Sequence, residues 1–335
     1  MRQILVTLIP FFLLSPAGLL RPSQVGAQDV DAVLPPVAAV AGVSPGALAL
    51  IDLSTFRLIR TVEGLATAHG AAISPDGSRA YALSLSRADQ AISVIDVRSG
   101  SVIDVIGLDA PAHHAAIDPS GDRLYLTWGS GGTGADRPRG IAAFDPESRA
   151  VANITTEGTP YYVAVSPDGA FLYSTTLNPS RIVKIALPAF EIVAREAMDG
   201  SPSHIAIAED GGTLFITLSG GGVASVDTRT LQVLGTADTG PGAHAVALAG
   251  DPVRLFVANR GASTLTVLDP GTLERVDEIE TPPVPSHLLR LPDGALLISA
   301  VGSKEVVKLD PNSLEVVGRV SLPMQPHQTW ASGNR

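Results

Sequence analysis

Apolar residues along this chain of 335 residues alternate with polar ones in short runs, and turns rich in Gly, Pro, Asn and Asp separate the runs. The segments 92–96 (Ile-Ser-Val-Ile-Asp) and 102–106 (Val-Ile-Asp-Val-Ile) are two examples. Alternation of this kind over four to eight residues is typical of half-buried β-strands, and no segment has the apolar period of a helix. The pattern predicts an all-β protein.

The strand pattern repeats along the chain. An apolar residue followed by Asp marks the end of a strand, and the Asp is expected to cap the next turn. The marker recurs every 41 to 49 residues, at Ile51-Asp52, Ile95-Asp96, Phe144-Asp145, Ile185-Ala186 (where the Asp is lost), Val226-Asp227, Leu268-Asp269 and Leu309-Asp310. Each complete unit contains four strand patterns, so the sequence predicts seven four-stranded repeats.

The two ends of the chain complement each other. The segments 37–41, 47–52 and 58–62 have the patterns of a second, third and fourth strand, with no first strand before them. Residues 327–330 form a surplus first strand. A last strand that completes the first repeat closes a ring and leaves no open sheet edge at the junction. We therefore expect a single domain over residues 28–335, a seven-bladed β-propeller closed by a C-terminal inner strand that joins the N-terminal blade.

The repeat resembles the YVTN-type β-propeller repeat of cytochrome d1-like and lactonase-like propellers. The resemblance rests on segments such as 77–84 (Gly-Ser-Arg-Ala-Tyr-Ala-Leu-Ser) and 254–260 (Arg-Leu-Phe-Val-Ala-Asn-Arg), and it covers essentially all of residues 28–335. Propellers of this kind include enzymes, cofactor carriers and binding modules, so the resemblance predicts the fold without choosing a function.

The first 27 residues are typical of a secretory signal peptide. Arg2 precedes the apolar run 4–14, and the segment ends in the small-residue pattern Val25-Gly26-Ala27. Cleavage after Ala27 is expected, with Ala17 as a weaker site and an uncleaved membrane anchor as the alternative. The protein would then be periplasmic or secreted, with no membrane insertion after cleavage. The chain has no Cys, which excludes disulfides, thiolate metal sites and a lipid anchor on Cys.

The net charge limits the classes of partner that we expect. The formal net charge is −10 and no basic stripe offsets it, so nucleic-acid binding is not expected. A small molecule or a periplasmic protein is the expected partner.

Every histidine of the chain lies at the same place in its repeat, a few residues before the turn that follows the first strand. The chain has seven, namely His69, His113, His114, His204, His244, His287 and His327. One repeat carries Tyr161 and Tyr162 in their place. The propeller resemblance implies that all these segments converge at one mouth of the central channel. Imidazoles without thiolates suit copper or zinc. Exported propellers with a similar arrangement, such as nitrous oxide reductase and thiocyanate dehydrogenase, hold copper, so a divalent metal is predicted, with copper favoured.

The histidines fall in two registers. Counted back from the anchor of the second strand, His69, His113 and His244 lie 12 residues away, whereas His114, His204 and His287 lie 11 away. Neighbouring side chains in a strand face opposite ways, so both sets can share one direction only if they lie in loops. The favoured ligands are His114, His204, His287 and His327. The alternative is that the histidines are structural and hydrogen-bonded within their blades.

Substrate contacts are expected from the same face of the ring. The candidates are Tyr161, Tyr162, Arg137, Arg181 and Arg260. No nucleophilic triad or nucleotide motif is present, and no catalytic residue is assigned. The leading hypothesis is a small-molecule or redox site built on the bound metal, and whether it is an enzyme stays open. The alternatives are a non-catalytic periplasmic binding propeller, for example an accessory to a quinone-dependent dehydrogenase, and thirdly a lactonase-like hydrolase.

Overall fold

The computed structural model describes residues 34–86, 88–129 and 139–333. The predicted signal peptide and Arg137 lie outside these ranges. Residues 34–335 form one compact unit. Within the described ranges, no helix is long and apolar enough to cross a membrane.

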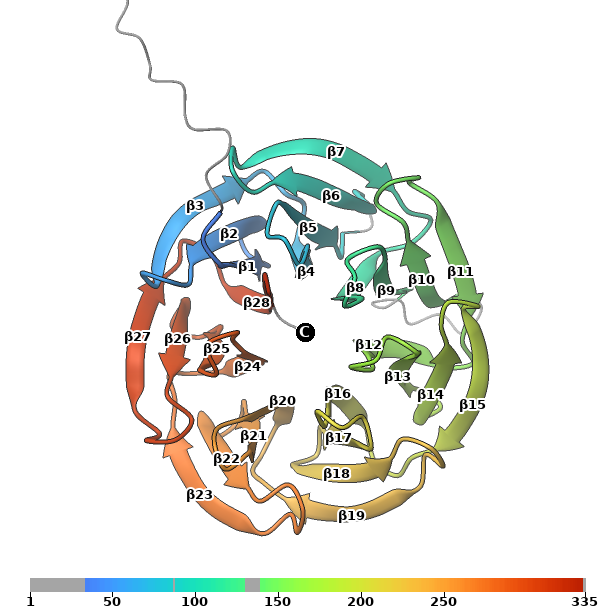
Figure 1. The fold of residues 1–335 in the computed structure, drawn as a ribbon, viewed down its shortest axis with the longest axis vertical. Helices are drawn as coiled ribbons and strands as arrows, with labels where there is room; N and C mark the ends of the chain where they lie inside the picture. The colour runs from blue at the N-terminus through green and yellow to red at the C-terminus, as the bar shows by residue number, and fades with distance from the viewer. Residues whose placement is uncertain (1–33, 87, 130–138, 334–335) are drawn as a thin grey trace, which may run out of the picture. The chain divides into compact units, whose positions relative to one another are not determined.

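The described residues form seven antiparallel sheets of four strands each, arranged as a ring (Figure 1). The region around the ring axis, enclosed by the innermost strands, is here called the channel. The innermost strands are β4 (Ala68–Ile73), β8 (Ala112–Ile117), β12 (Thr159–Val165), β16 (Pro202–Ile207), β20 (Ala243–Ala249), β24 (Pro285–Arg290) and β28 (Pro326–Ala331). The second strands are β1 (Val37–Gly42), β5 (Arg79–Ser84), β9 (Leu124–Trp128), β13 (Phe171–Leu177), β17 (Thr213–Leu218), β21 (Arg254–Asn259) and β25 (Leu296–Ala300).

The third strands are β2 (Ala47–Asp52), β6 (Ala91–Asp96), β10 (Gly140–Phe144), β14 (Arg181–Ala186), β18 (Gly222–Asp227), β22 (Thr264–Leu268) and β26 (Glu305–Leu309). The outermost strands are β3 (Arg57–Glu63), β7 (Ser101–Gly107), β11 (Val151–Thr155), β15 (Glu191–Ala197), β19 (Val233–Asp238), β23 (Arg275–Glu280) and β27 (Val316–Ser321). This all-β, seven-bladed architecture confirms the prediction.

The ring closes through the last strand. Strand β28 pairs antiparallel with β1, with Ala38 opposite Ala331 and Val40 opposite Thr329, and completes the sheet β28-β1-β2-β3. Beyond the strand, the Ser332 hydroxyl accepts a hydrogen bond from the Val37 amide at 2.9 Å. The predicted closure is therefore confirmed, and it places the C-terminal strand on the channel (Figure 1).

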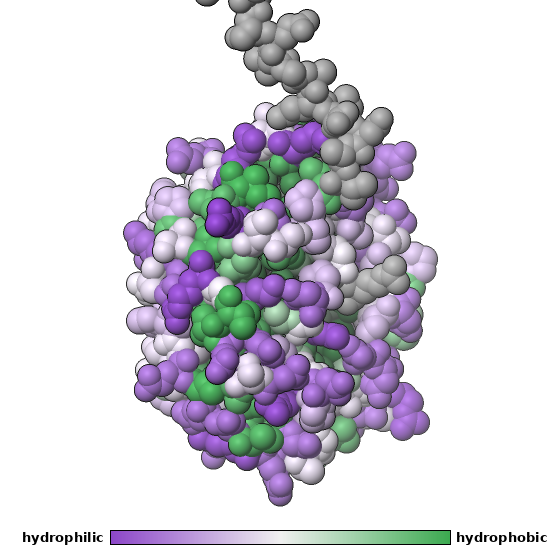
Figure 2. All heavy atoms as spheres, turned by 60° about the vertical axis from the view of Figure 1, so that its left-hand side comes forward, coloured by the Kyte–Doolittle hydropathy of each residue, from purple (hydrophilic) through white to green (hydrophobic). Residues whose placement is uncertain are grey.

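Burial decreases from the channel to the rim. Strands β1 and β4 are buried along their whole length, and Ala is frequent in them, which lets adjacent sheets pack closely. Larger side chains fill the space between blades further out, as where Tyr81 meets Phe144 with ring centroids 6.5 Å apart. The outermost strands expose apolar residues such as Ile59 and Val317. On the side of the molecule that Figure 2 shows, polar side chains lie among the apolar ones.

The repeated Asp after each third strand has the expected structural role. The Asp227 carboxylate accepts hydrogen bonds from the backbone amides of Arg229 at 3.0 Å and Thr230 at 2.7 Å. Asp52, Asp145, Asp269 and Asp310 make the same pair of contacts. These hydrogen bonds hold the turn into the outermost strand.

Candidate metal centre

Every innermost strand contains one extra residue close to its start. In β8, Ala112 lies opposite Trp128, but Ala115 lies opposite Leu126, so two residues occupy the space of one. The same shift occurs in β4, β12, β16, β20, β24 and β28. A β-bulge of this kind re-aims the side chains that it contains.

The bulge corrects the expectation that both histidine registers could face the channel only from loops. The histidines lie in strands, and the extra residue turns neighbouring side chains toward the same channel. His113 and His114 are adjacent, yet both of their rings contact the ring of His69, with centroids 4.0 and 5.2 Å away.

The channel-facing residues form two tiers. In each innermost strand, the entrance-tier residue directly follows the last paired residue before the bulge, which is Ala112 in β8. The entrance tier contains His69, His113, Tyr161, His244 and His327. The deep tier is the next residue and contains His114, Tyr162, His204, His287 and Gln328. Histidines of the entrance tier are 7 to 9% exposed, whereas those of the deep tier are 0 to 2% exposed. His327 therefore belongs with His69, His113 and His244, and its grouping with the other set was wrong.

All seven imidazoles belong to one cluster. Ring centroids lie 3.7 Å apart for His69 and His327, 4.1 Å for His113 and His114, and 4.3 Å for His204 and His244. His204 also lies 5.1 Å from His114 and 5.2 Å from His287. Residues from six of the seven blades thus meet in the channel, as the sequence predicted.

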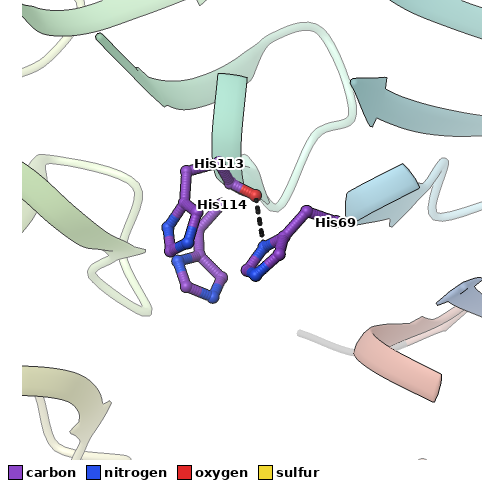
Figure 3. A group of neighbouring side chains, drawn as sticks. All are labelled: His69, His113 and His114. Atoms are coloured by element: carbon purple, nitrogen blue, oxygen red, sulfur yellow. Dashed lines mark hydrogen bonds between the residues drawn. The ribbon is translucent and has the colours of Figure 1, made fainter. Parts of the chain in front are cut away.

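Backbone carbonyls fix the tautomer of four histidines. Nδ1 of His69, His113 and His244 lies 3.3, 3.3 and 2.9 Å from the carbonyl oxygen of the entrance-tier position in the next blade. Nδ1 of His114 lies 2.7 Å from the carbonyl oxygen of Tyr161. Since a carbonyl only accepts, each Nδ1 carries the proton and donates it, which leaves the lone pair on Nε2. Metal-ligating histidines are commonly oriented in this way. Figure 3 shows the bond from His69 beside the rings of His113 and His114.

Burial keeps the cluster uncharged. It lowers the pKa of His113 to about 4 and the pKa values of His244 and His287 to about 3. The pKa values of His69, His114, His204 and His327 also lie well below the usual range, first because of burial and then because of repulsion between neighbouring imidazoles. At neutral pH the rings are therefore neutral and their lone pairs are available to a metal ion.

The deep tier contains nitrogens without a protein partner. Among the described residues, Nε2 of His114 and both ring nitrogens of His204 have no hydrogen-bond partner. A neutral imidazole always carries one N–H and one lone pair, so His204 leaves both unused in a buried place, which is costly. A metal ion on one nitrogen would satisfy it, and this fits the predicted role.

Among the described residues, two sets of three histidines could hold a metal ion. One set is His114, His204 and His287, and the other is His69, His113 and His114, with ligand nitrogens within 4.8 Å of one another in each set. The structure thus brings together three of the four favoured ligands. His327 lies against His69 instead.

The proposed substrate residues separate into distinct environments. The Tyr161 hydroxyl donates to Nε2 of His244 at 3.2 Å, and the Tyr162 hydroxyl lies 3.5 Å from Nε2 of His287. Burial lowers the pKa of His244, and the positive charge of Arg260 lowers it further. Burial raises the pKa of Tyr161, and Arg260 offsets a smaller part of that rise. Arg181 instead pairs with Glu157 at 3.2 Å.

Sequence reasoning missed the residues that hold the cluster in place. Gln328 accepts from the amides of Ala71 at 3.2 Å and Ala115 at 3.0 Å, and it donates to the Ala115 carbonyl at 2.7 Å. Trp330 donates to the same carbonyl at 3.1 Å. Hydroxyls of the second strands support the bulges, since Thr127 and Thr217 accept from the amides of His114 and His204. A Ser or Thr within an otherwise apolar second strand was the available signal.

Comparisons with known proteins agree with this architecture. The chain is similar over 88% of its length to 98% of a putative 6-phosphogluconolactonase from Bacteroides fragilis, with 16% identity and a TM-score of 0.71. It is similar over 89% of its length to 99% of a functionally unknown protein from Desulfotomaculum acetoxidans, with 16% identity and a TM-score of 0.73. For the dihydro-heme d1 dehydrogenase NirN, solved in complex with DHE, 89% of this chain covers 75% of that chain, with 17% identity and a TM-score of 0.65.

These identities support the fold alone. No curated protein matches the sequence. The family model described as YNCE-like beta-propeller matches residues 133–334, which is more than half of the chain. The chain belongs to the YNCE-like β-propeller family.

Proposed function

We propose that this protein is an exported propeller that binds one metal ion, with copper favoured, through His114, His204 and His287. The observation that carries the proposal is His204, which is 2% exposed and has no protein partner for either ring nitrogen among the described residues. A purely structural histidine would be expected to use at least one of its nitrogens in a hydrogen bond.

The donor set supports copper or zinc. The three-histidine groups found among the described residues contain neither carboxylate nor thiolate. Imidazole nitrogens suit copper, zinc, nickel and iron, and among divalent ions of the first row copper binds such donors most strongly. Because burial lowers the pKa values of all three histidines, protons compete weakly with the ion at neutral pH.

The charge of the site points to an anionic small molecule as the substrate or further ligand. Three neutral imidazoles leave the charge of a bound divalent ion uncompensated, and a buried charge without a partner is unfavourable. Arg260 adds a second positive charge near His244 and Tyr161, and its side chain forms no ion pair among the described residues. A small anion between the ion and Arg260, in contact with the Tyr161 hydroxyl, would balance both charges.

The location and partners follow from the same proposal. Residues 1–27 would direct export, and the mature chain would take up its ion in the periplasm or outside the cell. A redox reaction of the bound anion is the leading chemical role. A non-catalytic periplasmic binding propeller, for example an accessory to a quinone-dependent dehydrogenase, is the alternative, and a lactonase-like hydrolase is the third.

Elemental analysis tests the proposal. The mature protein, purified from an exporting host without chelators, should contain one copper or zinc ion per chain. The triple variant His114→Ala/His204→Ala/His287→Ala should fold and contain none. His327→Gln is the matched control, since this buried histidine lies outside both three-histidine groups, and it should keep the ion. A wild-type protein that stays metal-free after incubation with Cu²⁺ or Zn²⁺ would overturn the proposal.

A further inference from the structure

We infer that the cluster offers two alternative positions to a single metal ion, and that the ion enters at one and settles in the other by exchanging partners around His114. The entrance position consists of His69, His113 and His114, and the deep position consists of His114, His204 and His287. This inference rests on the proposed function, since it assigns a second position and a path to the same ion.

His114 allows only one position to be occupied at a time. Its Nδ1 donates to the Tyr161 carbonyl at 2.7 Å, so Nε2 holds the only lone pair that can bind a metal. Nε2 has no hydrogen-bond partner among the described residues, and the side chain is fully buried. His114 belongs to both three-histidine groups, so an ion in either position would use this nitrogen. A neutral imidazole nitrogen has one lone pair and binds one ion, so the two positions exclude each other.

The entrance position is the one that solvent reaches first. His69 and His113 are 9% and 8% exposed, whereas His204 and His287 are each 2% exposed. Nδ1 of His69 donates to the His113 carbonyl (Figure 3). Nδ1 of His113 donates to the Tyr161 carbonyl, and the two bonds orient the Nε2 atoms before an ion arrives. In the deep tier, Gln328 donates a hydrogen bond to the Ala115 carbonyl of β8, and Trp330 donates to the same carbonyl.

The deep position gains more from the ion. His204 has no protein partner for either nitrogen among the described residues, so coordination removes an unfavourable state there. His69 and His113 already use one nitrogen each, and an ion adds only to the other. The ion therefore loads through the entrance position and is held more tightly in the deep one.

Mutually exclusive positions have a distinctive binding signature. The apparent association constant is the sum of the constants of the two positions, while the stoichiometry stays at one ion. Removing the weaker position changes the apparent affinity by less than about two-fold, and removing the stronger one lowers it to that of the weaker position. Removing a ligand from both positions should lower the affinity by at least about 100-fold, the upper end of what the loss of a supporting partner alone costs a metal site.

Titration of the mature protein with Zn²⁺, followed by calorimetry for affinity and by stopped flow for the rate of loading, tests the inference. His69→Gln should slow loading and change the affinity by less than about two-fold. His204→Gln should weaken the affinity and leave the loading rate unchanged. His114→Gln should lose binding, and the double variant His69→Gln/His204→Gln gives the same test with His114 intact.

The outcomes separate this inference from the proposed function. A wild-type chain that binds no Zn²⁺ or Cu²⁺ overturns the proposed function and the inference with it. Two ions per wild-type chain, or undiminished binding by a folded His69→Gln/His204→Gln variant, overturn only the two-position inference. Identical effects of His69→Gln and His204→Gln on loading rate and affinity would contradict the assignment of entrance and deep positions.

Discussion

Replacing His204 by Leu should stabilise the metal-free protein. His204 is buried, and neither ring nitrogen has a hydrogen-bond partner among the described residues. An unsatisfied buried polar group costs about 1–3 kcal/mol, and Leu removes it while filling a similar volume. The backbone amide of His204 still donates to Thr217 at 3.0 Å, so the bulge should persist. Imperfect packing against Tyr162 and His244 offsets part of the gain, by less than about 1.5 kcal/mol.

His244→Leu is the matched comparison and should have the opposite effect. His244 is also a buried histidine of the cluster, but its Nδ1 donates to the Ser286 carbonyl at 2.9 Å and its Nε2 accepts from Tyr161 at 3.2 Å. Leucine leaves both groups without that partner, which should cost about 1–3 kcal/mol for each group that stays buried and unsatisfied. His204→Leu should therefore raise the free energy of unfolding of the metal-free protein, whereas His244→Leu should lower it.

Urea unfolding in the presence of EDTA, and again with excess Zn²⁺, measures both effects. With free ion at one hundred times its dissociation constant, the wild-type free energy of unfolding should rise by about 2.7 kcal/mol. The rise should be much smaller in His204→Leu, which would be more stable than wild type only without metal. If His204→Leu destabilises the chelated protein as much as His244→Leu does, His204 has a structural role and the argument from its unused nitrogens is wrong.

Three further predictions concern the surroundings of the cluster. The metal-free protein should lose stability as the pH falls below about 6.5, because histidines in the unfolded chain bind protons while folded His113, with a pKa of about 4, and His244 and His287, with pKa values of about 3, stay neutral. Each such group should lower the free energy of unfolding by about 1.4 kcal/mol per pH unit down to its folded pKa, and equal urea midpoints at pH 7 and pH 5 would contradict this. Gln328→Leu leaves the amides of Ala71 and Ala115 without that acceptor and should cost about 2–6 kcal/mol, whereas Leu at the exposed Gln232 should change stability by less than about 0.5 kcal/mol. Thr217→Val removes the hydrogen bonds to the His204 amide and the His244 carbonyl and should weaken Zn²⁺ binding as well as stability, and rescue of both by Thr217→Ser would distinguish the lost hydroxyl from altered packing.

The fold was predictable because its signals are local and repeated. Alternating apolar residues define each strand, the Asp marker defines the period, and the missing first strand before residue 37 matches the surplus strand after residue 325. Convergence of the histidines follows from the ring, since equivalent positions in all blades face one channel. None of this requires knowledge of which residues pair across a sheet.

The orientation of individual histidines was not predictable, because it depends on which residues pair across a sheet. A bulge is a property of two paired strands, and one strand read alone does not show that Ala112 and Ala115 face Trp128 and Leu126. Without the bulge, adjacent His113 and His114 would point to opposite faces. The position of His327 was also hidden, because no second strand follows it in the sequence to set its register and its partner is β1, near the other end of the chain.

The closing strand connects the stability of the ring to the histidine cluster. Strand β28 pairs with β1 in its own blade, and it also supplies His327 to the entrance tier and Gln328 to the deep tier. Gln328 hydrogen-bonds to Ala71 in β4 and Ala115 in β8, so this one side chain joins three consecutive blades. A ring that opens at the β1–β28 junction would withdraw Gln328 from Ala71 and Ala115 and expose the lone pairs that burial keeps unprotonated. If the cluster binds an ion only when the ring is closed, metal binding and ring closure must stabilise each other to the same extent.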